Sequence, residues 1–208
     1  QGTKEEILKI EDLLKRNKWQ VSSYMGKNGT EESFLNMHGK SPKLLHLATH
    51  GFYYTPNRAE NVDYLKGYTD AMSLSGLVLS GGNAAWLGKP LPKGVLGGIL
   101  SANDIARLDL SNTDMVVLSA CQTGQGKATS EGLYGLQRAF KKAGVGTIVM
   151  SLWSVSDKTT SEFMTTFYER LADKNNAWNK RKAFEEAKEI IRKKHPDPFH
   201  WAAFVMLD

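Results

Sequence analysis

Short apolar runs alternate with amphipathic segments along most of this chain, and no other feature limits its possible folds as strongly. The runs are rich in Val, Ile and Leu and cover residues 44–49, 74–79, 115–119, 147–152 and 201–206. Strands that are apolar on both faces are typical of parallel sheets covered by helices. The pattern therefore predicts an α/β fold with a mainly parallel central sheet.

The segments between these runs carry apolar residues at helical spacing. Helices are expected over 4–15, 30–36, 101–107, 132–143, 157–171 and 179–194, and a short strand over 20–23. Ser101 is an expected N-cap with Asp104 at the N3 position, and Ser156 or Asp157 caps the helix that ends near 171. Residues 81–98 are rich in Gly and Pro, which predicts a mobile surface loop.

Composition favours one globular domain over residues 1–208. The chain is 41% hydrophobic and 24% charged, and none of its apolar runs approaches the length of a membrane span. It opens on Gln1 rather than Met, so we expect a processed chain or a piece of a longer protein. A single cysteine excludes an internal disulfide and a Cys-rich zinc site, and it favours a reducing, cytoplasmic setting.

The formal net charge of +5 allows an acidic partner. The basic residues gather late, over 179–194, where apolar residues interleave with them at helical spacing. This arrangement favours a solvated helix face over a nucleic-acid stripe, so direct nucleic-acid binding is not expected.

Two reactive side chains follow apolar runs, at the strand ends where open α/β sheets gather their catalytic groups. His50 follows the run at 44–49, and Cys121 follows the run at 115–119. An imidazole beside a thiol can draw off its proton and produce the thiolate nucleophile. Gly51 lets the backbone turn after His50 and direct its N–H into the site, where it and the Cys121 N–H could form an oxyanion hole. Read singly, Cys121 is better explained as a small buried side chain at a strand end, and His50 as a turn residue with its hydrogen bonds satisfied.

The sequence gives little support for a metal site or a nucleotide-binding loop. His46 and His50 have the i, i+4 spacing of a helical metal site, but their neighbours predict a strand, so no metal is expected. Gly124-Gln125-Gly126 lacks the remaining residues of a dinucleotide fingerprint or a P-loop. We expect no cofactor. Nucleotide binding at the sheet edge would rest on fold analogy alone.

Four blocks of sequence resemble the CHAT domain, a caspase- and separase-related peptidase-like module that often follows tetratricopeptide repeats in bacterial proteins. They are LHLATHGF (45–52), LDLSNTDMVVLSACQTGQG (108–126), EGLYGLQRAFKKAGVGTIVMSLWSVSD (131–157) and HWAAFVMLD (200–208). The resemblance implies a caspase-like α/β/α sandwich over nearly the whole chain. Family members show a further strand ahead of Gly2, so it also implies a domain that lacks its first strand or has its sheet completed by another chain.

The resemblance also implies roles for individual residues. It makes His50 the general base, Cys121 the nucleophile and Gly51 an oxyanion donor. A stretch like LWSVSD supplies, in separases, the acid that meets a basic substrate residue, and here this acid is Asp157. A helix cap is an equally good interpretation of Asp157, and Glu131 is a weaker competitor for the role of specificity acid.

We therefore predict a cysteine endopeptidase that cleaves a protein substrate after Arg or Lys. A regulatory domain or partner, such as tetratricopeptide repeats, is expected to control it. The alternative is a catalytically silent caspase-like module that docks partners or transmits a signal.

Overall fold

The computed structural model describes residues 2–54, 59, 65–91, 95–119 and 130–208. The chain divides into two compact units. One consists of residues 24–152 and 207–208, and the other of residues 1–23 and 153–206. Each is described by itself below.

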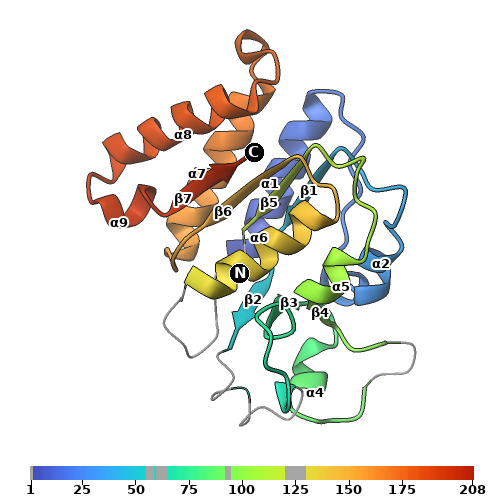
Figure 1. Cartoon of the computed structure of the whole chain (residues 1–208). Coiled ribbons are helices and arrows are strands. Elements are labelled where there is room, and N and C mark those ends of the chain that lie inside the picture. Colours follow the sequence, from blue (N-terminus) through green and yellow to red (C-terminus); the bar gives the residue numbers. More distant parts are fainter. Residues whose placement is uncertain (1, 55–58, 60–64, 92–94, 120–129) are drawn as a thin grey trace. The chain divides into compact units, whose positions relative to one another are not determined.

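A parallel sheet forms the centre of the unit that contains residues 24–152. Its strands β1 (Leu44–Leu47), β5 (Met115–Leu118) and β6 (Thr147–Ser151) come from three of the predicted apolar runs. The strand β5 lies between the other two and is parallel to both (Figure 1). All four residues of β5 are buried, as its unbroken apolar sequence MVVL requires. The predicted α/β class is confirmed, and the strands that precede His50 and Cys121 are paired with each other.

The same unit contains a second, antiparallel sheet. Its strands are β2 (His50–Tyr53), β3 (Ser75–Val78) and β4 (Ile99–Ser101), with β3 in the middle (Figure 1). Only β3 coincides with a predicted strand. A small core packs beneath this sheet, and its buried members are Phe52, Ala59, Leu65, Leu74 and Ile99.

Two helices of this unit begin at capping side chains. The helices are α2 (Glu31–Leu35), α4 (Gly82–Trp86), α5 (Ala102–Ala106) and α6 (Ser130–Lys142), with a 3₁₀ turn η1 at Gly26–Asn28. The Thr30 side chain accepts the backbone N–H of Ser33 at the start of α2. Ser101 is the expected N-cap of α5, and together with Asp104 it forms a capping box.

Residues 81–98, expected to be a loop, contain the helix α4. Ala85 and Trp86 of this helix pack against the core beneath the antiparallel sheet. The Trp86 ring meets the Phe52 ring edge-on, with centroids 5.1 Å apart. The beginning of the segment is therefore a packed element, and the mobility of the rest stays a prediction.

The second unit is built from helices around an aromatic core. Its elements are α1 (Gly2–Arg16), α7 (Asp157–Ala172), the 3₁₀ turn η3 (Lys174–Asn176), α8 (Lys180–Lys194) and α9 (Pro198–Trp201), followed by β7 (Phe204–Leu207). The helix α7 packs against both α1 and α8. Phe163 of α7 is fully buried, and its ring stacks on that of Phe204 at 3.9 Å.

Two expectations differ from the structure in this unit. Residues 20–23 form no strand, since Val21 is their one apolar residue and the Ser23 hydroxyl donates to Glu11 instead. The last strand begins at Phe204 rather than Trp201, because Asp197 caps the short helix α9 with Pro198 in its first turn.

Candidate active site

The paired ends of β1 and β5 carry the two predicted catalytic residues in equivalent sequence positions. Leu47 lies opposite Leu118, and the Ser119 N–H donates to the Leu47 carbonyl at 3.0 Å. His50 is the third residue after Leu47, and Cys121 is the third after Leu118. Cys121 lies outside the described residues, so its role stays a prediction.

His50 does not simply terminate β1. It is the first residue of β2, where it lies opposite Val78 of β3 and is exposed. The chain therefore leaves the parallel sheet after Leu47 and enters the antiparallel sheet at His50. Among the described residues, no side chain hydrogen-bonds to the His50 ring.

The hydrogen-bond pattern between β2 and β3 determines the direction in which the Gly51 N–H points. The Tyr54 N–H donates to the Leu74 carbonyl at 2.9 Å, which makes this pair a hydrogen-bonded position. Hydrogen-bonded positions recur at every second residue of an antiparallel ladder, so Gly51, opposite Leu77, falls on a non-bonded one. Its N–H therefore points away from β3, as an oxyanion donor on this strand would require.

Two contacts hold the beginning of β2 in place. The Thr49 hydroxyl, next to His50, donates to the Val78 carbonyl of β3. Opposite Phe52, Gly76 has no room for a side chain, because a Cβ there would lie 2.4 Å from the Leu100 carbonyl oxygen and 2.8 Å from the Phe52 ring. The absence of a side chain at Gly76 lets Phe52 pack closely on β3.

Two glutamates of α2 hold the chain just ahead of β4. Glu31 accepts the Gly98 N–H at 2.9 Å, and Glu32 accepts the Leu96 N–H at 2.7 Å. Burial raises the pKa of the Glu31 carboxyl. Hydrogen bonds from its own backbone N–H and from that of Leu96 lower the pKa of Glu32. These carboxylates anchor the last residues of the segment 81–98 at its junction with the antiparallel sheet.

Asp157 is an exposed residue in the first turn of α7. The cap is Ser156, whose side chain accepts the Thr159 N–H at 3.2 Å, so the capping role considered for Asp157 falls to its neighbour. A carboxylate in the first turn also interacts favourably with the helix dipole. The competitor Glu131 is in the first turn of α6.

An aromatic contact follows β6 that the sequence alone did not reveal. The Trp153 indole N–H donates to the Phe199 carbonyl at 2.9 Å, and the two rings lie 6.2 Å apart. Trp153 is half-buried. The position of Trp153 in the LWSVSD stretch, which also contains Asp157, was the one sign in the sequence that this residue matters. Its partner Phe199 is too distant in the sequence to be predicted from that stretch.

Metal binding and membrane insertion find no support in the described part of the chain. There, no three His, Cys, Asp or Glu side chains are grouped as a metal site would need. Within the same residues, no helix combines the length and apolar character needed to cross a bilayer.

Comparison with known proteins identifies the relatives of this chain. The model of the CHAT domain family matches residues 1–208. Tetratricopeptide repeat protein 28 of Mus musculus is 32% identical over 111 residues, which are 52% of this chain and 4% of that protein. The protein of the same name from Homo sapiens matches with the same identity and coverage. The chain thus corresponds to a small part of these relatives, and both are mammalian, so the bacterial setting stays a prediction.

Proposed function

Because this chain belongs to the CHAT domain family, which is caspase-like, we propose that it is a cysteine endopeptidase that cleaves a protein substrate. The observation that carries the proposal is the β1–β5 register. It pairs Leu47 with Leu118, and in the sequence His50 and Cys121 each come three residues after these paired residues.

In the proposed mechanism, the Cys121 sulfur attacks the scissile carbonyl carbon while the thiol proton passes to His50. The carbonyl oxygen becomes an oxyanion that accepts the N–H groups of Gly51 and Cys121. The C–N bond then breaks as His50 gives its proton to the leaving amine. Water, deprotonated by His50, hydrolyses the remaining thioester and restores the thiol.

We further propose that Asp157 selects Arg or Lys at the cleaved position. Its exposed carboxylate is not used for capping, since Ser156 caps α7. A carboxylate in a partly desolvated pocket binds a guanidinium with favourable geometry and charge. The proposed partners are the protein substrate and a regulatory domain or partner, and the tetratricopeptide repeat proteins among the relatives support the latter. We propose a cytoplasmic location from the single cysteine.

Substitution of Cys121 tests the peptidase. Cleavage of a peptide library by the whole chain, together with its regulatory partner where one is needed, should vanish in Cys121→Ala. His50→Ala should lower the rate by about two to four orders of magnitude, the usual contribution of a general base. Undiminished cleavage in Cys121→Ala would overturn the mechanism. Absence of cleavage and of thiol labelling in every state would favour the silent interaction module.

Two neighbouring substitutions separate specificity from capping. Asp157→Asn should abolish the preference for Arg or Lys and leave thermal stability nearly unchanged. Ser156→Ala should lower stability by about 1 kcal/mol through loss of the cap, and leave the preference intact. Library profiling together with thermal unfolding measures both effects. A basic preference that survives Asp157→Asn would assign specificity to another residue, with Glu131 the first to test.

A further inference from the structure

Two tryptophans stack on one another at the surface of the unit that contains α1, α7 and α8. The rings of Trp19 and Trp178 lie 4.1 Å apart at an interplanar angle of 22°. Trp19 follows α1, and Trp178 lies in the connection from η3 to α8. Both are half-buried, so each ring retains surface for another molecule to contact.

The backbone around this pair is strained. The non-glycine residues with positive φ in the described part of the chain are Lys18 (65°), Ala177 (44°) and Trp178 (61°). The left-handed conformation costs an L-residue about 1–2 kcal/mol. Strain of this kind is retained where the structure enforces it, and it tends to gather at functional sites. Here all three residues belong to the tryptophan pair or adjoin it.

The end of α1 shows how Trp19 is held. The Lys18 N–H donates to the Lys15 carbonyl at 2.9 Å, and the Trp19 N–H donates to the Leu14 carbonyl at 3.0 Å. These bonds form a Schellman motif with Lys18 at the position that glycine usually occupies. A glycine would relieve the strain, whereas Lys18 places an exposed cation next to Trp19.

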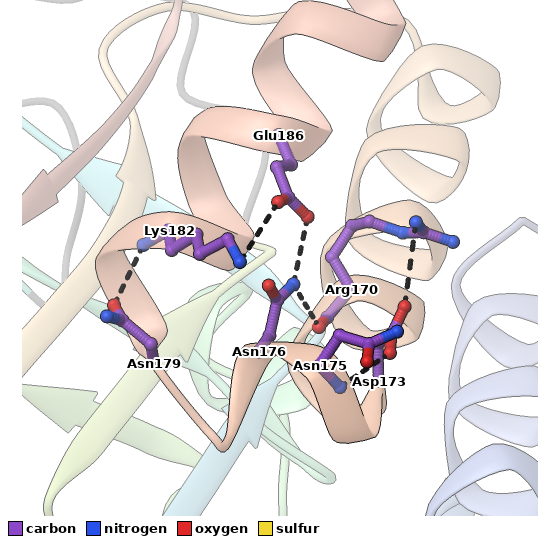
Figure 2. Close-up of polar contacts among 7 residues, drawn as sticks. All are labelled: Arg170, Asp173, Asn175, Asn176, Asn179, Lys182 and Glu186. Carbon is purple, nitrogen blue, oxygen red and sulfur yellow. Dashed lines mark hydrogen bonds and ion pairs between the residues drawn. The ribbon is translucent and has the colours of Figure 1, made fainter.

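Hydrogen bonds of two asparagines fix the chain on either side of Ala177 and Trp178. Figure 2 shows Asn176 between the end of α7 and the start of α8. This residue is 4% exposed, and its amide donates to the Arg170 carbonyl and to Glu186, each at 2.8 Å. Asn179 then accepts the Lys182 N–H and caps α8. Ala177 and Trp178 are therefore held between two anchored asparagines, and their conformation is set before any partner binds.

The two segments that carry the tryptophans, residues 15–19 and 174–182, contain basic residues and no acidic one. These basic residues are Lys15, Arg16, Lys18, Lys174, Lys180, Arg181 and Lys182. Trp and Arg are enriched at the energetic centres of protein interfaces, and this surface contains both.

Carboxylates on the adjoining turns limit what this surface can bind. Glu11, Asp12, Asp173 and Glu186 pair with Lys15, Arg16, Arg170 and Lys182 at 2.6, 2.6, 3.8 and 3.9 Å. A nucleic-acid strand carries a phosphate at every nucleotide, so it would bring some of them against these carboxylates. A polypeptide can space its acidic side chains so that they meet the cations and avoid the anions.

We propose that the stacked pair Trp19–Trp178 and its basic surroundings form a docking surface for an acidic segment of a partner polypeptide. Carboxylates of the partner pair with the exposed Lys18 and Lys174, and an apolar or proline side chain packs on the indoles. This binding does not depend on the peptidase, so an inactive Cys121→Ala chain retains it.

Selection from a random peptide library tests this surface. The Cys121→Ala chain is immobilised, bound peptides are selected, and those that also bind Cys121→Ala/Trp178→Ala are discarded. The remaining peptides should be rich in Asp and Glu. Their affinity, measured by fluorescence anisotropy, should fall about tenfold or more in Lys18→Glu/Lys174→Glu. Lys9→Glu/Lys27→Glu reverses two exposed charges elsewhere and should change it little.

Folding and the competing ligands are checked in the same series. Trp178→Phe keeps an aromatic ring and should keep both the unfolding temperature and most of the binding. The proposal is overturned if no peptide depends on Trp178, or if the dependent peptides are not acidic. It is also overturned if Trp178→Ala instead abolishes binding to a thymidine oligonucleotide or to anionic phospholipid vesicles.

Discussion

Gly76 offers the sharpest test of how the strand that carries His50 is held. A Cβ at this position would lie 2.4 Å from the Leu100 carbonyl oxygen of β4 and 2.8 Å from two atoms of the Phe52 ring of β2. The first obstacle is backbone, so the strands themselves would have to separate. We expect Gly76→Ala to cost about 3 kcal/mol, the upper end of the usual cost of overpacking.

Thermal and urea unfolding measure this cost. For a chain of this size, about 3 kcal/mol corresponds to a fall of about 6–12 °C in the midpoint temperature. Gly39→Ala is the matched control, because Gly39 has a φ of +69° but no atom within 4 Å of its added Cβ. It should cost only the conformational penalty, about 1–2 kcal/mol. If Gly76→Ala is no more destabilising than Gly39→Ala, the close packing of β2, β3 and β4 is not what positions this strand.

Three further substitutions test single contacts. Thr49→Val removes the hydroxyl next to His50 that donates to the Val78 carbonyl. In the proposed peptidase this change should lower kcat more than it raises KM, and an effect on KM alone would refute a positioning role for Thr49. Glu162 accepts a hydrogen bond from His195 at 2.8 Å, which lowers the pKa of its carboxyl. Its stabilising effect is therefore present above its ordinary pKa of about 4.3 and is lost as the pH falls through the lowered value. Glu162→Gln should accordingly lower the unfolding temperature at pH 7 and converge with the unsubstituted chain in acid, and a constant difference across pH would contradict this. Phe163→Ala should cost about 3–5 kcal/mol in urea unfolding, because its fully buried ring stacks within the core; a cost below about 1 kcal/mol would show that the core collapses around the cavity.

Features that depend on neighbouring residues followed from the sequence. The Ser101 cap forms as expected, and Thr30 and Asn179 cap their helices in the same way, because a side chain that satisfies a helix N-terminus lies within three residues of its acceptor or donor. The apolar strands of the parallel sheet were equally clear, because burial on both faces leaves a continuous run of apolar side chains.

Pairing between distant segments required the tertiary structure. The sequence predicted that His50 closes a strand, yet it opens β2, because its partner strand β3 is supplied by residues 75–78 far along the chain. No local pattern marks Gly76 as the residue that Phe52 needs opposite it. Likewise, Trp19 and Trp178 meet only because α1 and α8 both pack on α7.

The sequence by itself therefore determined the α/β class, the parallel strands and most helix starts, since these depend on side-chain type and short-range spacing. Only the tertiary structure decided that His50 and Gly51 belong to a second sheet and that two tryptophans form one surface. These features depend on contacts between residues far apart in the chain, and the free energy of such contacts is not encoded in any single segment.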